Sequence, residues 1–354
     1  MLHRVSEHLA RMARDERHSR MTALPRIRRA HTIAVAALVA TTLALTACSS
    51  GDSGPTENES GQTSSSNYPV TVDSAYGALT LDDKPERILV MSPSYVDMLT
   101  AIDIQPVAFA TGSIPAADFD SNYPWLEGRY DGAVAADLVT ADFKPSLEVI
   151  ASYQPDLILA HTWSVSDDLY AGISQIAPTY VSSDDGSAAT QWTVDMKAIG
   201  ALTQHADAAE TALADFDSVV EQYKDQLANL QNKTYNSIAV RDAGYQFGSG
   251  GWLSLMGLQP ADTQGTYTDA PLSPENMDQL SADVLLAYTF SDSDRAKFEG
   301  DGRFADLPAA KNGTALFGDP AMANAATFPA PAALKYLMDR TVPILETSAL
   351  NQEN

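Results

Sequence analysis

The sequence predicts an α/β protein of two Rossmann-like lobes, with mainly parallel sheets, joined by a long rigid spine helix. Apolar strand runs alternate with helical stretches in two groups, over 68–200 and 234–349, and this alternation is typical of parallel α/β sheets. A stretch without Gly or Pro lies between them at 201–232. In addition, SLEVIASYQPDLILA at 146–160 recurs without a gap as SPENMDQLSADVLLA at 273–287, and such a repeat indicates duplicated architecture.

Residues 1–47 are predicted to be a secretory signal peptide. Arg26, Arg28 and Arg29 precede a short apolar run and then small residues, which is the order of a secretory signal. The apolar run is too short to favour a membrane span. Residues 1–20 add charge that the signal does not need, so we expect translation to start at Met21. Leu45-Thr46-Ala47-Cys48 resembles the lipobox of bacterial lipoproteins, which implies lipidation of Cys48; the alternative is ordinary cleavage beside an incidental cysteine.

The segment from the lipidated Cys48 to residue 67 is rich in Ser, Gly and acidic residues, and predicts a flexible tether. Without residues 1–47 the chain keeps 14 basic and 43 acidic residues, a formal charge near −29. That charge argues against nucleic acid or an anionic lipid surface as a partner. His161 and His205 are the histidines that remain, too few for the zinc or manganese sites that combine several histidines with acids.

Seven strands are expected, at 88–91, 106–110, 156–160, 179–182, 237–241, 283–288 and 314–317. A helical region from about 190 to 233 separates the two lobes, with the spine helix itself at 201–233. Its apolar residues recur every three or four positions and form one stripe: Ala209, Leu213, Phe216, Val220, Tyr223, Leu227 and Leu230.

The repeat places a glutamate at two equivalent helix starts, Ser146-Leu147-Glu148 and Ser273-Pro274-Glu275. Serine is a good N-cap, and proline suits the first helical position. Helices that precede parallel strands begin at the carboxyl edge of the sheet, where ligands bind. Glu148 and Glu275 should therefore lie one on each lobe beside a cleft. The alternative is that each glutamate only complements its helix dipole, which stabilises by up to about 1 kcal/mol.

Several segments together resemble the ferric siderophore and cobalamin branch of periplasmic-type substrate-binding proteins, the lipoprotein receptors of ABC importers. Residues 68–110 resemble the family's entry, with K-P-x-R-I before the first core strand; PDLI at 155–158, IAP at 176–178, residues 192–213 and 273–287 follow in the family's order. The resemblance covers nearly all of 68–345. It implies a class III periplasmic-binding-protein fold, a monomer lipid-anchored at the outer face of the cytoplasmic membrane, and docking of Glu148 and Glu275 onto the permease dimer.

Strand ends that face the cleft should supply the ligand contacts. They are Tyr95, His161, Trp163, Arg241, Tyr245, Trp252 and Tyr288. Aromatic faces and a cationic donor suit a large iron chelate, and the resemblance implies an arginine near position 241. The aromatic residues could equally be packing residues, Arg241 could pair with Asp242, and His161 could be a haem ligand.

No enzyme is predicted. GSGG at 248–251 lacks the G-K-[ST] ending of a phosphate loop, and the sequence has no G-x-S-x-G elbow. The predicted function is a receptor that binds a ferric siderophore and delivers it to an ABC permease, with no cofactor or resident metal. The alternatives are a haem or corrinoid receptor of the same fold, or a surface interaction protein that lost transport. The siderophore class stays open, although a single cationic candidate favours ligands less anionic than triscatecholates.

Overall fold

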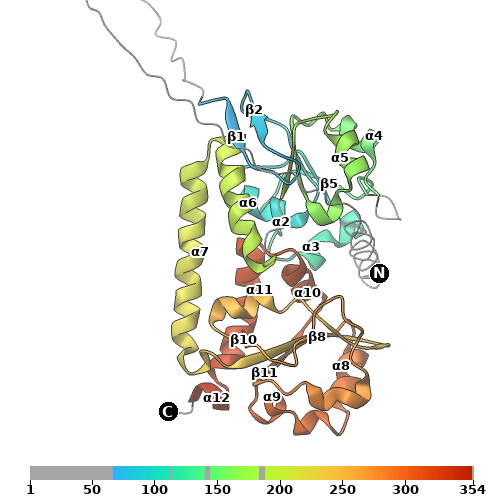
Figure 1. Ribbon diagram of the computed structural model, residues 1–354, viewed down its shortest axis with the longest axis vertical. Helices are drawn as coiled ribbons and strands as arrows, with labels where there is room; N and C mark the ends of the chain where they lie inside the picture. Colours follow the sequence, from blue (N-terminus) through green and yellow to red (C-terminus); the bar gives the residue numbers. More distant parts are fainter. Residues whose placement is uncertain (1–66, 112–113, 140–143, 183–187, 353–354) are drawn as a thin grey trace, which may run out of the picture.

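The computed structural model describes residues 67–352, apart from 112–113, 140–143 and 183–187. The predicted signal peptide, Cys48 and nearly all of the tether lie outside these residues. Figure 1 shows an elongated molecule in which one α/β lobe lies above the other and helix α7 runs beside both. The predicted fold class is confirmed.

The N-terminal lobe contains a five-stranded parallel sheet in the order β5-β4-β3-β6-β7. Its strands are β3 (Ile88–Val90), β4 (Ala108–Ala110), β5 (Ala133–Ala135), β6 (Leu157–His161) and β7 (Thr179–Ser182). An antiparallel hairpin of β1 (Val70–Val72) and β2 (Leu79–Leu81) precedes the sheet. The helices of this lobe are α2 (Pro93–Thr100), η1 (Ala116–Asp118), α3 (Phe119–Asn122), α4 (Leu147–Ser152), η2 (Thr162–Ser164) and α5 (Asp167–Ile173).

The C-terminal lobe contains the parallel order β10-β8-β11-β12, with β9 antiparallel to β8. Its strands are β8 (Thr234–Arg241), β9 (Gly244–Phe247), β10 (Gln259–Pro260), β11 (Val284–Tyr288) and β12 (Ala315–Gly318). Its helical elements are η4 (Gly251–Met256), η5 (Pro274–Gln279), α8 (Asp292–Glu299), η6 (Phe304–Asp306), α9 (Pro308–Lys311), α10 (Pro320–Thr327), α11 (Pro331–Glu346) and α12 (Ala349–Gln352). All seven predicted strands are present. The five strands that were not predicted are short, with two to four residues each: β1, β2, β5, β9 and β10.

The connection between the lobes differs from the single helix expected over 201–233. It consists of two helices, α6 (Ala188–Thr203) and α7 (Ala206–Gln226), followed by a 3-10 turn, η3 (Ala228–Leu230). Gln204 has a left-handed backbone (φ 60°) and ends α6, so the chain turns back. Figure 1 shows α6 and α7 side by side, joined near the top of the N-terminal lobe. A Cβ on Gly200 would lie 2.6 Å from the Cβ of Ala209, so glycine permits this close approach.

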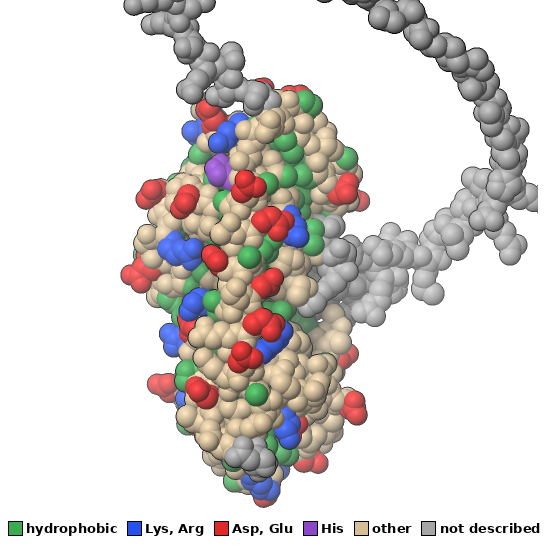
Figure 2. Space-filling model, turned by 90° about the vertical axis from the view of Figure 1, so that its left-hand side faces the viewer, with side chains coloured by type: hydrophobic (Ala, Val, Ile, Leu, Met, Phe, Trp, Pro, Cys, Tyr) green, Lys and Arg blue, Asp and Glu red, His purple; other side chains and the backbone are tan. Residues whose placement is uncertain are grey.

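The predicted apolar stripe of α7 is buried in full. Ala209, Leu213, Phe216, Val220 and Tyr223 face the interior, and Leu227 and Leu230 continue the stripe. These residues belong to one apolar core that extends from the N-terminal sheet through α6, α7 and α11 into the C-terminal sheet. Burying a large apolar side chain contributes about 1.5–3 kcal/mol. The lobes are therefore packed on a common spine, and Figure 2 shows that its outer side carries Lys, Arg, Asp and Glu side chains.

Helix α11 begins beside the N-terminal lobe, where Asp97 of α2 caps its first turn, and runs from there into the C-terminal lobe. Its own N-cap residue, Ala330, has no side-chain acceptor. The Asp97 carboxylate instead accepts hydrogen bonds from the backbone N–H groups of Ala332 (3.2 Å) and Ala333 (2.9 Å), and Arg129 lies 3.8 Å from it. Asp97 is fully buried, and burial raises its pKa to about 6 against the opposing effect of these partners. We name this contact the Asp97 cap.

We predict that Asp97→Asn lowers the free energy of unfolding by about 1–3 kcal/mol, because the amide offers one acceptor where α11 presents two donors. Urea denaturation followed by circular dichroism measures this. Asp215→Asn, at an exposed position of α7, is the matched control and should change stability by less than about 0.5 kcal/mol. Equal stability of the two variants would contradict a capping role for Asp97.

Candidate functional site

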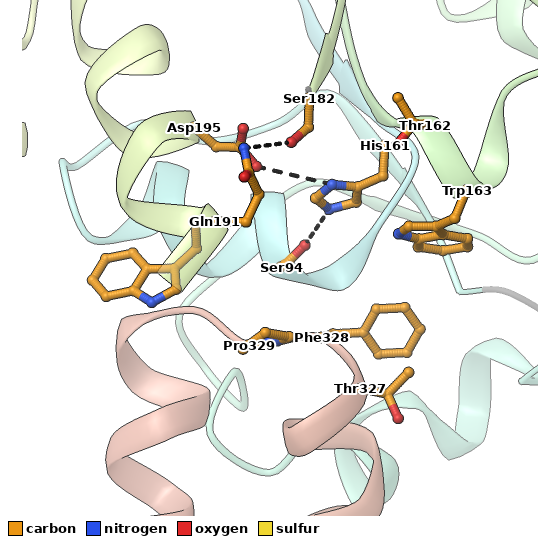
Figure 3. Close-up of a pocket in the computed structure, with 11 residues that line it drawn as sticks. Ser94, His161, Thr162, Trp163, Ser182, Gln191, Asp195, Thr327, Phe328 and Pro329 are labelled. Carbon is orange, nitrogen blue, oxygen red and sulfur yellow. Dashed lines mark hydrogen bonds and ion pairs between the residues drawn. The ribbon is translucent and has the colours of Figure 1, made fainter. Parts of the chain in front are cut away.

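A pocket lies between the carboxyl edge of the N-terminal sheet and the segment that joins α10 to α11 (Figure 3). Five N-terminal elements contribute residues to it: the start of α2, the ends of β6 and β7, η2, and the first turns of α6. The C-terminal side is the α10–α11 connection. The lining residues are Ser94, His161, Thr162, Trp163, Ser182, Gln191, Trp192, Asp195, Thr327, Phe328 and Pro329.

Two neighbouring strands end at this pocket in register. His161 of β6 pairs with Ser182 of β7, the last residues of both strands. From α6, the amide of Gln191 donates to the Ser182 hydroxyl (3.3 Å). The ends of β6 and β7 therefore meet the side of α6 at the carboxyl edge of the sheet. Open α/β sheets bind ligands at this edge.

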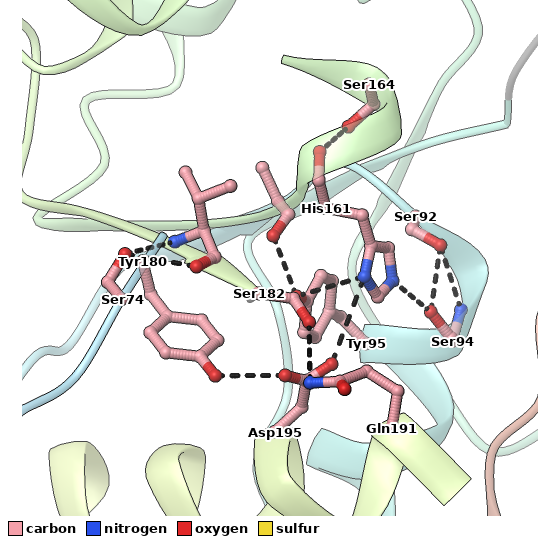
Figure 4. A network of polar contacts seen from close by, with 12 residues as sticks. Ser74, Ser92, Ser94, Tyr95, His161, Ser164, Tyr180, Ser182, Gln191 and Asp195 are labelled. Atoms are coloured by element: carbon pink, nitrogen blue, oxygen red, sulfur yellow. Dashed lines mark hydrogen bonds and ion pairs between the residues drawn. The ribbon is translucent and has the colours of Figure 1, made fainter. Parts of the chain in front are cut away.

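His161 is fixed by a buried polar network (Figure 4). Its Nε2 lies 2.9 Å from Ser94 Oγ, and its Nδ1 lies 3.4 Å from the Tyr95 hydroxyl and 3.9 Å from Asp195 Oδ2. The hydroxyl of Tyr180 donates to Asp195 Oδ1 (2.9 Å). Burial lowers the pKa of His161 to about 3, so the imidazole is neutral at physiological pH. The same burial, reinforced by Asp195, raises the pKa of Tyr95.

An aromatic column forms one wall of the pocket. The rings of Tyr95 and His161 stack with centroids 4.4 Å apart, and those of His161 and Trp163 with centroids 5.7 Å apart. Phe328, from the C-terminal side, lies 5.9 Å from Trp163. Trp163 remains 44% exposed although it is large and apolar. Figure 3 shows Trp163 above Phe328, where the two lobes meet. The exposed part of the Trp163 ring is available to a ligand.

The structure brings together some of the predicted ligand residues and separates others. His161 and Trp163 line the pocket, and Tyr95 lies buried behind His161, with its hydroxyl donating to the carbonyl of Ala160 (2.8 Å). Trp252 and Tyr288 are buried and hydrogen-bonded to each other (3.2 Å). Tyr245 packs against Phe298 inside the C-terminal lobe. These last three side chains do not line the pocket, and their surroundings are those of packing residues.

Arg241 ends β8 at the carboxyl edge of the C-terminal sheet. Its guanidinium carbon lies 3.7 Å from the centroid of the Phe290 ring, a cation–π contact. Among the described residues no ion pair joins it to Asp242, the alternative considered from the sequence. Partial burial lowers its pKa, but the group stays charged. Arg241 therefore presents a half-buried cation at the corresponding sheet edge of the second lobe.

Glu148 and Glu275 are exposed in the first turns of α4 and η5. The two starts are less alike than the repeat predicts. Ser146 caps α4 by accepting from the N–H of Val149 (3.3 Å), whereas η5 is a 3-10 helix with non-helical backbone at Asn276. A hydrogen bond from the Ser273 side chain lowers the pKa of Glu275. Both carboxylates thus remain solvent-facing at helix starts on separate lobes.

Sequence reasoning did not find most of the polar lining. Ser94 and Ser182 follow or end buried strands, so the strand-end rule that selected Tyr95 and His161 could have selected them too. Gln191, Trp192 and Asp195 were assigned to a helix without a ligand role, and Phe328 lies in a connection of the other lobe. These residues reach the pocket only because of the way α6 and α11 pack, and no local sequence pattern predicts that packing.

No group of three or more His, Cys, Asp or Glu that could hold a metal ion occurs within the described residues. His205 is the residue before α7, and its side chain makes no capping hydrogen bond there. Its Nδ1 lies 2.8 Å from the carbonyl oxygen of Thr203, and the residue is not part of the pocket lining. Over the part of the chain that the structure describes, no helix is both long and apolar enough to span a bilayer.

Two α/β lobes on a shared spine, with a pocket at a sheet edge, agree with the fold that the resemblance to substrate-binding proteins implies. Residues 88–321 match the family described as periplasmic binding protein, and the chain belongs to that family. A probable siderophore-binding lipoprotein of Bacillus subtilis, YfiY, is 27% identical over 269 residues, covering 72% of this chain and 78% of that protein. The Fe(3+) dicitrate-binding periplasmic protein FecB of Escherichia coli is 34% identical over 111 residues, 31% of this chain and 34% of that protein.

Solved structures show the same fold. A periplasmic solute-binding protein of Mycobacterium smegmatis superposes with a TM-score of 0.63 at 25% identity, covering 78% of this chain and 97% of that one. PiaA of Streptococcus pneumoniae, solved in complex with ferrichrome, also gives 0.63, at 19% identity over 80% of this chain and 100% of that one. The family resemblance inferred from residues 68–345 is confirmed.

We predict that the stability difference between the wild type and His161→Gln depends on pH. The folded pKa of His161, about 3, lies below its ordinary value of 6.5. The neutral imidazole therefore contributes fully to the free energy of unfolding above about pH 6.5. This contribution is lost as the pH falls, because His161 takes up a proton in the unfolded chain but not in the folded one. Between pH 7 and 5.5 the wild type should lose about 1 kcal/mol relative to the variant, measured by urea denaturation. His205→Gln is the control for loss of a histidine. A difference that does not change with pH would contradict the buried, neutral state of His161.

Proposed function

We propose that this protein is an extracytoplasmic receptor, lipid-anchored through Cys48, that binds a ferric siderophore and delivers it to an ABC permease. The observation that carries the proposal is the pocket at the N-terminal sheet edge, with an exposed Trp163 over a fixed His161, in a chain of the periplasmic binding protein family. The names of the relatives YfiY and FecB, which refer to siderophore and ferric dicitrate binding, support the ligand class.

The pocket has the features of a preformed binding site. The polar side chains of Ser94, Ser182 and Gln191 already hydrogen-bond to neighbours, so few of them would lose rotamer freedom when a ligand binds. The Asp97 cap fixes α11 a few residues after Phe328. Preorganisation of this kind favours affinity by reducing the entropy cost of binding. Proposed ligand contacts are His161 and Trp163 from one lobe and Arg241 from the other, with Tyr95 supporting His161.

Glu148 and Glu275 are the proposed contacts with the permease dimer. Each is an exposed carboxylate at the start of a helix, one on each lobe. Leu147, beside Glu148, is 42% exposed, so the first of these positions also offers an apolar contact. Charged groups at a rim mainly guide encounter and orientation of a partner. The receptor itself breaks no bond in this scheme.

We predict that ferric siderophores quench the tryptophan fluorescence of the mature chain, because Trp163 and Trp192 both line the pocket. Trp163→Leu should weaken binding about tenfold or more, the effect of removing an aromatic contact residue, and should reduce the quenching. Trp125→Phe, outside the pocket lining, is the control and should bind normally. A Soret shift with haem, and no quenching by ferrichrome, ferric citrate or a ferric triscatecholate, would favour a haem receptor. No response to any of them would favour an interaction protein.

We predict that the double variant Glu148→Ala/Glu275→Ala keeps its ligand affinity but abolishes siderophore-dependent iron uptake. Uptake of radioactive iron by cells, alongside fluorescence titration of the purified variant, measures both properties. Glu210→Ala/Glu221→Ala removes two exposed glutamates of α7 and is the matched control for the change in charge. Normal uptake by the first double variant would remove the docking assignment.

A further inference from the structure

His161 has both ring nitrogens engaged by the protein itself (Figure 4). Its Nε2 lies 2.9 Å from Ser94 Oγ, and its Nδ1 lies 3.4 Å from the hydroxyl oxygen of Tyr95. Because the Tyr95 hydroxyl donates its proton to the carbonyl of Ala160 (2.8 Å), its oxygen accepts from Nδ1–H, and Nε2 accepts from the Ser94 hydroxyl. Neither nitrogen is therefore left to bind a metal ion or to hydrogen-bond with a ligand.

The imidazole also stacks with two aromatic rings, one buried and one exposed. It is nearly parallel to the ring of Tyr95 (18°) and to that of Trp163 (19°). Tyr95 is fully buried, the His161 side chain is 15% exposed, and Trp163 is 44% exposed. Phe328 of the other lobe meets the Trp163 ring at a tilt of 50°. The stack thus leads from the core of the N-terminal lobe to the pocket, with His161 in the middle.

The backbone on both sides of Trp163 is fixed close to His161. His161 directly precedes η2, and the Ser164 hydroxyl donates to the His161 carbonyl (2.8 Å). The N–H of Val165 donates to the carbonyl of Thr162 (3.4 Å). A fixed backbone still allows a tryptophan side chain more than one rotamer. Stacking on an imidazole that is itself held in place favours one of these rotamers.

We infer that His161 is a positioning residue: it holds the Trp163 ring in the orientation that meets the ligand and does not coordinate iron, whether in a chelate or in haem. This inference rests on the proposed function for the ligand that Trp163 meets, and it limits the contact proposed for His161 to carbon atoms of its ring. A tryptophan held in one rotamer loses less entropy when a ligand binds. Loss of the stack should therefore weaken binding about five- to tenfold, the size of an aromatic pair contribution.

Two substitutions separate the aromatic ring of His161 from its nitrogens. His161→Phe keeps a ring that can stack with Tyr95 and Trp163 but has no nitrogen. His161→Gln keeps groups that hydrogen-bond to Ser94 but has no ring. His205→Gln, outside the pocket lining, is the control for loss of a histidine. Urea denaturation verifies that each variant is folded.

The first measurement needs no ligand and is fluorine NMR of the mature chain labelled with 5-fluorotryptophan. The sequence contains four tryptophans, and Trp163→Leu identifies the Trp163 signal. We expect His161→Gln to move that signal toward the position of free 5-fluorotryptophan in water, because the stacked neighbour is lost. His161→Phe should keep the signal shifted away from that position, and His205→Gln should leave it unchanged. An unmoved signal in folded His161→Gln would overturn the inference.

The second measurement is isothermal titration calorimetry with ferrichrome and with ferric citrate. For a chelate that binds the wild type, His161→Gln should weaken binding about five- to tenfold and His161→Phe less than about twofold. In a Trp163→Leu background, His161→Gln should weaken binding by less than about twofold more, because a residue that acts through Trp163 has little effect once that ring is gone. Equal losses in His161→Gln and His161→Phe, or losses that add to that of Trp163→Leu, would overturn the inference.

Haem tests directly whether a nitrogen of His161 binds iron. We expect any Soret shift on adding haem to be the same in the wild type and in His161→Phe. A Soret shift that disappears in folded His161→Phe would overturn the inference. If neither ferric chelate binds the wild type, that result counts against the proposed function, and the fluorine signal of Trp163 still decides the role of His161.

Discussion

The arrangement of the lobes depends on a buried carboxylate that caps a helix of the opposite lobe. Helix α11 begins at Pro331 after an alanine that cannot cap it, and unsatisfied N–H groups at a buried helix start are costly. Asp97 of α2 accepts from two of them, which fixes α11 against the N-terminal lobe. The buried face of α11 packs into the core that both lobes share, through residues that include Leu334, Leu337 and Met338.

The pocket is a consequence of that attachment. Phe328 and Pro329 lie directly before α11, so the contact that fixes the helix also positions the C-terminal wall across from His161 and Trp163. A second contact acts in the same place, since Asn324 of α10 donates to the carbonyl of Asn122 (3.2 Å). The N-terminal wall is fixed independently by the register of β6 with β7 and by the Ser94–His161 hydrogen bond. Both walls of the pocket are therefore held in place by contacts within the protein.

The sequence was sufficient for the fold and for part of the site. Apolar runs and the helical period identified the seven core strands and the α7 stripe, because those patterns follow from burial alone. They did not reveal the turn at Gln204, where a non-glycine residue adopts a left-handed backbone, nor the short strands β1, β2, β5, β9 and β10. At the pocket, the rule that strand ends face the cleft pointed to His161 and Trp163. The places of Asp195, Gln191 and Phe328 in the pocket depend on the packing of α6 and α11, which the sequence pattern does not predict. Trp252 and Tyr288 also lie at the predicted strand ends, but their side chains hydrogen-bond to each other.

We propose that iron, within its chelate, is held in the pocket between the two lobes. Anomalous diffraction at the iron absorption edge, from crystals of the mature chain grown with ferrichrome or with ferric citrate, locates the metal without assuming a contact. We expect one strong iron peak in the pocket, beside Trp163 and Phe328. A peak on another surface of the protein would contradict this proposal. So would the absence of a peak with either chelate in crystals where no neighbouring molecule blocks the pocket.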